Sequence, residues 1–188
     1  MLGYYNYTVI LTYIGMLTGF CGIAAAMEGN TQAALLCLMG SGLCDMFDGK
    51  IASTMERTRS EKQFGIQIDS LSDLVCFGVL PALIVYRAAG VGLWLCGLYV
   101  LCALIRLAWF NVDEQQRQEQ SGERRTEYLG LPVTTAAVIF PMTAALSHML
   151  HVPVRGLAHL VMTVTGAAFL TPFRVKKPHL GREELKRL

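Results

Sequence analysis

The sequence contains few charged residues. Asp, Glu, Lys and Arg make up only 16% of its 188 residues, whereas a soluble domain carries about 25%. Hydrophobic residues make up 53% of the chain, and the mean hydropathy is +0.43. These values argue against a water-soluble globular protein and indicate an integral membrane protein. The net charge of only +2 leaves no basic surface of the kind that binds nucleic acid.

Patterned cysteines and a basic N-terminus are also lacking. None of the six cysteines forms a Cys-x-x-Cys pair, and none lies near a histidine at zinc-finger spacing. All six lie in apolar stretches, so we interpret them as small buried side chains. The first seven residues contain no Lys or Arg, although a signal peptide normally begins with basic residues. We therefore expect the first apolar run to be a helix of the mature protein.

The apolar runs predict an all-α integral membrane protein with a bundle of six transmembrane helices. A membrane span needs about 20 apolar residues, so the chain has no room for a second, soluble domain. We expect residues 1–188 to form a single membrane domain. The predicted helices cover residues 8–27, 31–54, 65–86, 88–112, 128–150 and 156–173.

The basic residues predict the orientation of these helices. Twelve of the sixteen Lys and Arg residues lie in the polar segments 56–62 and 113–127 and in the tail 174–188. The opposite side of the bundle has only Arg87 and Arg155. Because cytoplasmic loops are enriched in Lys and Arg, we expect the three basic segments and both termini to be cytoplasmic.

Aspartate is rare, but it is concentrated where it is least expected. The chain has five aspartates, and four of them lie inside predicted membrane helices: Asp45, Asp48, Asp69 and Asp73. A carboxylate in hydrocarbon costs about 2.5–3.5 kcal/mol, so four of them require a compensating partner. The first two are spaced i, i+3 and the last two i, i+4, so each pair shares a helix face. Asp45 and Asp73 each lie about 12 Å from the cytoplasmic ends of their helices, and packing of the two antiparallel helices would bring the four carboxylates together.

Divalent cations are the partner that such a cluster predicts. Carboxylate oxygens suit Mg²⁺, Mn²⁺ or Ca²⁺ better than Zn²⁺. Four carboxylates could hold two ions about 3.5–4 Å apart, an arrangement that supports phosphoryl chemistry. The alternative is that some aspartates cap helices or pair with Lys50 and Arg106. The small residues Gly49 and Ala52 would let a ligand approach the helix backbone, or neighbouring helices pack closely.

The two segments that carry these aspartates resemble the signature of the CDP-alcohol phosphatidyltransferase family. That signature reads D-x-x-D-G-x-x-A-R, eight residues, then G-x-x-x-D-x-x-x-D. The chain has Asp45-Met-Phe-Asp48-Gly49-Lys-Ile-Ala52 and Gly65-Ile-Gln-Ile-Asp69-Ser-Leu-Ser-Asp73. The resemblance implies a six-helix membrane enzyme, usually a homodimer, that transfers the phosphatidyl group of CDP-diacylglycerol to an alcohol and releases CMP.

Three further segments are similar to the phosphatidylserine synthases within this family. They are residues 69–82, 104–112 and 128–133, the last of which contains a Gly-Leu-Pro sequence. This similarity implies that the acceptor alcohol is L-serine and that the enzyme lies in a prokaryotic plasma membrane. The position of the aspartates relative to the basic loops predicts an active site near the cytoplasmic face.

The resemblance also implies roles for the aspartates and their neighbours. Asp45, Asp48 and Asp69 would bind Mg²⁺ or Mn²⁺, and Asp73 would complete a second metal site. Asp73 would also be the general base that accepts the proton of the serine hydroxyl. The residues implied in binding CDP-diacylglycerol are Asp48, Gly49, Ala52 and Gly65, with Gly49 and Ala52 lining the cytidine pocket.

The sequence departs from the family signature at one position. Ser53 stands where the family has arginine, and eleven residues rather than eight separate it from Gly65. The longer segment contains Arg57 and Arg59, and we expect one of them to reach the pyrophosphate of CDP-diacylglycerol. The alternative is that both are solvated residues of a basic cytoplasmic loop.

Arg106 is the one arginine inside an apolar run. It lies about 9 Å from the cytoplasmic end of its predicted helix, close to the depth of the aspartates. An arginine at that depth has to face the protein interior or a wet cavity, and its guanidinium matches a carboxylate or a phosphate. We predict that Arg106 binds the serine carboxylate or the lipid phosphate; the alternative is a pair with an aspartate. Asn111 is a second candidate for orienting serine; the alternatives are that it caps its helix or contacts lipid headgroups.

Three other functions stay open. The same chemistry with glycerol 3-phosphate or inositol phosphate would require more basic residues near the site, so the single buried arginine favours serine. A divalent-cation transporter would require polar residues through the whole membrane, but the charges are confined to the cytoplasmic third. Because the motif arginine is replaced, the protein could also be a catalytically inactive member of the family, although all four aspartates are retained.

Overall fold

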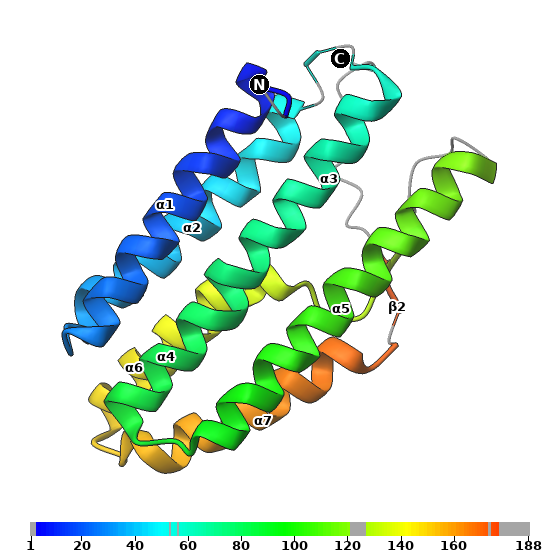
Figure 1. The fold of residues 1–188 in the computed structure, drawn as a ribbon. Helices are drawn as coiled ribbons and strands as arrows, with labels where there is room; N and C mark the ends of the chain where they lie inside the picture. Colours follow the sequence, from blue (N-terminus) through cyan, green and yellow to red (C-terminus); the bar gives the residue numbers. More distant parts are fainter. Residues whose placement is uncertain (1–2, 53, 56, 121–126, 173, 177–188) are drawn as a thin grey trace, which may run out of the picture.

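The structure is a computed structural model that describes residues 3–52, 54–55, 57–120, 127–172 and 174–176. These residues form six helical rods and one pair of three-residue strands (Figure 1). The third rod consists of α3, the π-helical segment η1 and α4, which follow one another without a break. The elements are α1 (Tyr7–Met27), α2 (Thr31–Ala52), α3 (Arg59–Asp73), η1 (Leu74–Val79), α4 (Leu80–Ala89), α5 (Leu93–Gln120), β1 (Glu127–Leu129), η2 (Val133–Thr135), α6 (Ala136–Leu150), α7 (Val154–Leu170) and β2 (Arg174–Lys176).

Four of the rods could cross a membrane. Within the described part of the chain, the helices that are long and apolar enough are Val9–Met27, Arg59–Ala89, Leu93–Gln116 and Val133–Leu150. The other two rods differ for separate reasons: α7 has only 17 residues, and α2 has three charged residues in its last turns. Six transmembrane spans and cytoplasmic termini therefore stay predictions.

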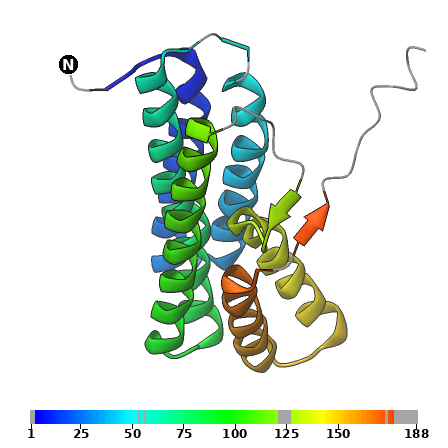
Figure 2. The ribbon, with the colours of Figure 1, turned by 90° about the vertical axis from the view of Figure 1, so that its right-hand side faces the viewer.

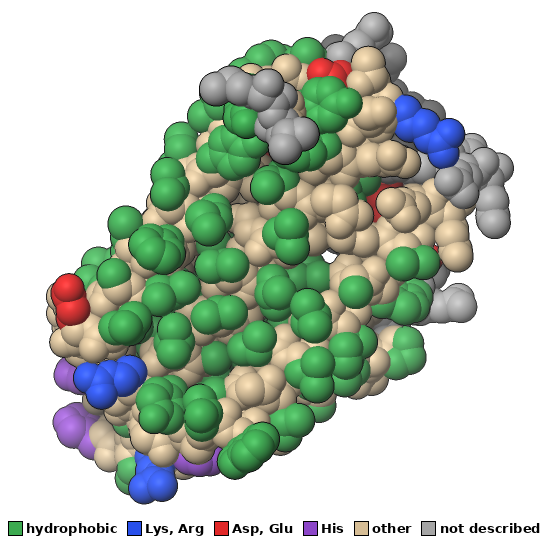
Figure 3. All heavy atoms as spheres, in the orientation of Figure 1, with side chains coloured by type: hydrophobic (Ala, Val, Ile, Leu, Met, Phe, Trp, Pro, Cys, Tyr) green, Lys and Arg blue, Asp and Glu red, His purple; other side chains and the backbone are tan. Residues whose placement is uncertain are grey.

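The surface is that of a protein embedded in an apolar medium. Hydrophobic side chains cover most of the face seen in Figure 3, and charged side chains lie mainly toward the two ends of the molecule. Large apolar side chains project outward, and Trp94 is 90% exposed. Soluble monomers rarely expose apolar patches of this extent, so the observed surface indicates contact with lipid.

Capping residues decide where several helices begin. Gly29 has a φ of 83° and ends the turn after α1, and the Asn30 side chain accepts a hydrogen bond from the Ala33 backbone N–H at the start of α2. Thr58 and Glu61 form a capping box, in which each side chain accepts from the other residue's backbone N–H. This cap starts α3 at Arg59, so the prediction of a loop through residue 62 was wrong.

The segment from 88 to 135 also differs from the prediction. Gly90 adopts a left-handed conformation with a φ of 60° that ends α4, so α5 begins only at Leu93. Its polar continuation to Gln120 is rich in Gln, Glu and Arg, which favour helix, and the expected loop there is therefore helical. Gly130, with a φ of 75°, and Pro132 prevent a helix from Tyr128 onward. Residues 127–129 instead pair with residues 174–176 of the predicted tail.

The rod formed by α3, η1 and α4 connects the bundle, because it contacts α1, α2, α5 and α7. α1 packs along α2 and also contacts α3, η1 and α4, whereas α2 has few contacts with α3 itself. Glycines permit the close approach of α1 and α2, because a Cβ added to Gly22 would lie only 2.8 Å from the Cys37 Cβ. α6 and α7 pack together beside one half of the bundle (Figure 2). This packing leaves room between α2 and α3 near the start of α1.

Candidate active site

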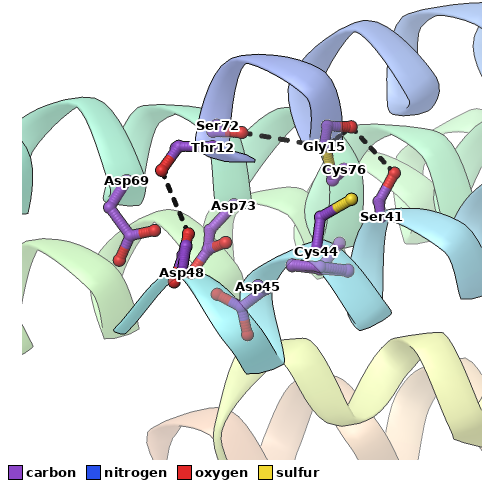
Figure 4. Close-up of a pocket in the computed structure, with 11 residues that line it drawn as sticks. Thr12, Gly15, Ser41, Cys44, Asp45, Asp48, Asp69, Ser72, Asp73 and Cys76 are labelled. Carbon is purple, nitrogen blue, oxygen red and sulfur yellow. Dashed lines mark hydrogen bonds between the residues drawn. The ribbon is translucent and has the colours of Figure 1, made fainter. Parts of the chain in front are cut away.

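A small pocket lies between α1, α2 and the rod formed by α3 and η1. All four aspartates singled out by the sequence line it (Figure 4). The other lining residues are Thr12, Gly15, Ser41, Cys44, Ser72, Cys76 and Phe77. The pocket therefore collects side chains from three rods around one group of carboxylates.

The four carboxylates lie close together. Oxygen atoms of Asp45, Asp48 and Asp69 all lie within 4.8 Å of one another. The Asp73 carboxyl is within hydrogen-bonding reach of Asp45, and that of Asp48 is within reach of Asp69. Asp48 and Asp73 are each only 9% exposed. α2 and α3 make few direct contacts, so their carboxylates face one another across the pocket. α1 forms one side of this pocket.

The donor set fits a hard divalent cation. Three carboxylate oxygens within 4.8 Å of one another could surround one ion, and carboxylate oxygens are ligands that Mg²⁺ and Mn²⁺ accept. Arg106 is not among the residues that line the pocket, and the side chain of Lys50 lies outside the described part of the structure. Among the described side chains that line the pocket none is basic, so this donor set could hold a divalent cation.

α1 contributes more to the pocket than the sequence indicated. The Thr12 hydroxyl donates a hydrogen bond of 3.0 Å to Asp48 Oδ2. One turn further along, the Gly15 carbonyl accepts from the Ser41 hydroxyl at 3.0 Å. The only available signal was spacing, because residues 12, 15 and 19 share one helix face and are all small or polar.

The structure separates the two arginines that could replace the missing motif arginine. A Cβ added to Gly65 would lie 3.0 Å from Arg57 Nη1, so the Arg57 guanidinium lies over the first half of α3. Its Nε is buried and has no hydrogen-bond partner among the described residues. Gly65 precedes Asp69 by four residues, about 6 Å along the helix. Arg59 is the exposed first residue of α3, and Ser53 lies outside the described residues.

The N-terminal end of α1 holds the connection that carries Arg57. The Asn6 amide donates to Glu61 Oε1 at 2.7 Å, and the Tyr7 and Thr54 hydroxyls are 3.1 Å apart. These contacts join the segment before α3 to α1 on both sides of Arg57. Arg57 is thus flanked in the sequence by two residues that contact the start of α1.

The glycine of the first motif faces open space. A Cβ added to Gly49 would meet no atom within 4 Å, and the residue is exposed. This position leaves the helix backbone accessible beside Asp48. Ala52 is the last residue of α2, and its side chain, like that of Lys50, lies outside the described part of the structure.

Arg106 does not line the aspartate pocket. It is 8% exposed on α5, and its Nε donates to the Leu131 carbonyl at 3.3 Å. Its guanidinium carbon lies 5.9 Å from the ring centres of Trp109 and Phe110. Arg106 therefore joins α5 to the Gly-Leu-Pro turn before α6.

Asn111 connects α5 to α3. It is buried, accepts a hydrogen bond of 2.8 Å from the Ser70 hydroxyl, and lies 3.5 Å from Gln67 Oε1. Because α5 continues to Gln120, Asn111 does not cap the helix. Ser70 directly follows Asp69, so Asn111 lies beside the helix face that neighbours the pocket.

Comparison with known proteins identifies the family to which this sequence is similar. The family model for CDP-alcohol phosphatidyltransferases matches residues 5–171. The chain is 30% identical over 152 residues to a CDP-diacylglycerol–serine O-phosphatidyltransferase of Helicobacter pylori strain J99, covering 78% of this chain and 60% of the relative. It is 32% identical over 133 residues to the archaetidylserine synthase of Methanothermobacter thermautotrophicus, covering 69% and 53%. It is 25% identical over 190 residues to the CDP-diacylglycerol–serine O-phosphatidyltransferase of Bacillus subtilis, covering 97% and 96%.

The chain belongs to the CDP-alcohol phosphatidyltransferase family. The matched region contains α1 to α7, including every residue that lines the aspartate pocket. The chain spans about three-fifths of the Helicobacter relative and nearly the whole of the Bacillus relative.

Proposed function

We propose that the protein transfers the phosphatidyl group of CDP-diacylglycerol to the hydroxyl of L-serine, which yields phosphatidylserine and CMP. The observation that carries this proposal is the convergence of four carboxylates from α2 and α3 on one pocket. Support for serine comes from the relatives, whose names specify serine as the acceptor or archaetidylserine as the product.

Two divalent ions, Mg²⁺ or Mn²⁺, are part of the proposal. Asp45, Asp48 and Asp69 would hold one ion, and Asp73 would complete the site of the second. When bound, the ions would stabilise negative charge on the pyrophosphate and on the departing CMP. The mutual proximity of the carboxylates supports this assignment, because without cations they would repel one another.

Asp73 is the proposed general base. Its carboxylate would accept the proton of the serine hydroxyl while the serine oxygen forms a bond to the β-phosphorus. The bond between that phosphorus and the oxygen of CMP would break, and CMP would leave with the electron pair. Burial of Asp73 beside Asp45 supports this role, because it holds the carboxylate inside the pocket and away from bulk water.

The nucleotide lipid would bind along α2 and the start of α3. Arg57 would contact the pyrophosphate, and its buried Nε, which has no hydrogen-bond partner among the described residues, supports this role. Gly49 and Ala52 would line the cytidine pocket, beside Asp48. Gly65 would give the Arg57 guanidinium room to lie over α3, while the exposed Arg59 would assist from the helix start.

The acceptor would bind between α3 and α5. Arg106 would bind the serine carboxylate or the lipid phosphate, and Asn111 would orient the serine. The burial of both side chains on α5, together with the contact of Asn111 to Ser70, supports a polar path beside the aspartate pocket. Arg106→Ala should therefore raise the KM for serine.

We further propose that residues 1–188 act as one domain in the plasma membrane, as a homodimer, with the pocket near the cytoplasmic face. The concentration of basic residues in the segments next to the pocket end of the helices supports this orientation.

The decisive experiment measures CMP release from CDP-diacylglycerol by purified protein in detergent with Mg²⁺ or Mn²⁺. Serine, glycerol 3-phosphate, inositol phosphate and no acceptor are compared. We expect release that depends on serine and falls by about 10²–10⁴-fold in Asp73→Asn, the range typical for loss of a general base. Glu28→Gln is the matched control, since Glu28 is exposed at the far end of α1.

Other outcomes would separate the parts of the proposal. Release with a different acceptor would keep the mechanism and overturn the choice of serine. Flux of divalent ions into sealed vesicles, without any CMP release, would favour a transporter instead. Unchanged activity in Asp73→Asn would exclude this residue as the base.

A further inference from the structure

α1 contacts a carboxylate of the aspartate pocket through Thr12. Thr12 is 7% exposed although its helix contains no charged residue. Its hydroxyl donates to Asp48 Oδ2 at 3.0 Å (Figure 4). A carboxylate has about four lone-pair positions on its two oxygens. The bond from Thr12 occupies only one of these positions, on Asp48 Oδ2.

The position of Thr12 is fixed by contacts one turn away. The Gly15 carbonyl accepts from Ser41 of α2 at 3.0 Å and from the Cys76 thiol of η1 at 3.6 Å. A Cβ on Gly15 would lie 3.0 Å from the Cys44 Cβ, so α1 and α2 are in close contact there. The backbone of α1 is therefore held against both walls of the pocket. The Thr12 hydroxyl consequently has a defined place relative to Asp48.

We infer that Thr12 is a positioning residue that orients the Asp48 carboxylate for metal binding. The inference rests on the proposed metal site. A hydroxyl is a neutral donor, so it fixes the carboxylate while leaving its negative charge available for a cation. A lysine or arginine in the same place would fix the carboxylate but compete with the cation for its charge. α1 would thus be part of the metal site although it supplies no metal ligand.

Metal binding without substrate gives the test its readout. Removing a hydrogen-bond partner of a metal ligand typically weakens metal affinity by about 10–100-fold. We would measure Mn²⁺ binding to the purified protein in detergent by electron paramagnetic resonance, with neither CDP-diacylglycerol nor serine present. Thr12→Val, which keeps the shape and removes the hydroxyl, should weaken Mn²⁺ binding by about 10-fold or more. Thr12→Ser should restore binding to about the wild-type level, because it retains the donor.

Thr18→Val is the matched control. Thr18 lies on the same helix, and its hydroxyl donates to the Ile14 carbonyl of α1 itself. It does not line the pocket, so its replacement should leave Mn²⁺ binding unchanged. The double variant Thr12→Val/Asp48→Asn should bind Mn²⁺ no more weakly than Asp48→Asn alone, because Thr12 acts through that carboxylate.

Each contrary result has a distinct meaning. Wild-type Mn²⁺ affinity in Thr12→Val, or equal weakening in Thr12→Ser, would overturn the positioning role while leaving the metal site intact. Absence of Mn²⁺ binding to the wild type, or binding unchanged by Asp69→Asn, would overturn the metal site itself. Thr12→Ala serves if Thr12→Val does not elute as a folded protein, and failure of both to fold would assign Thr12 to folding instead.

Discussion

The Tyr99 hydroxyl donates a hydrogen bond of 2.9 Å to the backbone carbonyl of Phe77, across the buried contact between α5 and η1. Pro81 follows Phe77 by four residues and has no N–H, so the α-helical donor for this carbonyl is missing. The hydroxyl takes its place and lets the rod continue through the proline. The π-helical segment η1 begins directly after Asp73, and Phe77 itself lines the pocket, so the bond holds a residue of the pocket wall.

Tyr99→Phe should destabilise the protein. It removes the donor but keeps the ring that packs against Phe140 and Phe169 at centroid distances of 5.6 and 5.5 Å. A buried carbonyl left without a partner costs about 1–3 kcal/mol. We expect a lower apparent melting temperature in detergent, measured as loss of the monodisperse peak after heating. Tyr86→Phe, at an exposed tyrosine of α4, should melt like the wild type, and equal melting of both variants would contradict the assigned role of this bond.

The aspartate cluster could be predicted from the sequence because helical spacing determines which side chains share a face. The aspartate pairs at i, i+3 and i, i+4 lie on two consecutive antiparallel helices. Packing of these helices therefore allows few arrangements other than a cluster of the four carboxylates. The length of α5 and the start of α6 could not be predicted in this way. They depend on the left-handed turn at Gly90 and on the pairing of residues 127–129 with residues 174–176, which are far apart in sequence.

Two further features could not be predicted from the sequence: the contribution of Thr12 to the pocket, and which of Arg57 and Arg59 lies over α3. Both depend on how α1 packs against two other rods and on contacts of its first residues with the loop before α3. A threonine in an apolar helix is common, and two arginines in a basic loop look alike in a sequence. Only the three-dimensional arrangement places one guanidinium over Gly65 and leaves the other at an exposed helix start.

Divalent cations should stabilise the protein even without substrate. Asp45, Asp48 and Asp69 have oxygens within 4.8 Å of one another, so their ionised forms repel. An ion that binds only the folded state adds about 2.7 kcal/mol at a concentration of 100 times its Kd. We expect Mg²⁺ or Mn²⁺ to raise the apparent melting temperature and EDTA to reverse the rise.

Asp69→Asn separates repulsion from ion binding in the same experiment. The variant should melt higher than the wild type in EDTA, because one of the repelling charges is gone. It should also lose most of the increase that Mg²⁺ or Mn²⁺ produces. A wild-type response to the ions in this variant would mean that they act elsewhere on the protein.

Arg57→Ala should weaken the binding of CDP-diacylglycerol more than Arg59→Ala. The Arg57 guanidinium lies over Gly65, and its buried Nε has no partner within the part of the chain that the structure describes; a pyrophosphate oxygen would supply one. Hydrogen bonds to charged groups contribute about 1.5–3 kcal/mol, which corresponds to a rise of about 10–150-fold in KM. The measurement is KM for CDP-diacylglycerol in mixed micelles, at saturating serine. Lys62→Ala, at an exposed residue of the same basic segment, serves as the control, and a larger rise in Arg59→Ala than in Arg57→Ala would reverse the assignment.

Gly49→Ala should separate stability from substrate binding. A Cβ at this position meets no atom within 4 Å, and alanine is favoured over glycine inside a helix by about 0.5–1 kcal/mol, so the fold should be as stable as the wild type or slightly more stable. If Gly49 lines the cytidine pocket, the added methyl group would instead occupy space that the nucleotide needs. We therefore expect an unchanged or higher melting temperature together with a higher KM for CDP-diacylglycerol. Gly97→Ala makes the same backbone change at an exposed position of α5 where the added Cβ also meets nothing, and its KM should not change. A KM equal to that of the wild type in Gly49→Ala would show that the nucleotide does not approach α2 at this residue, and the cytidine pocket would then have to lie on another face of the helix.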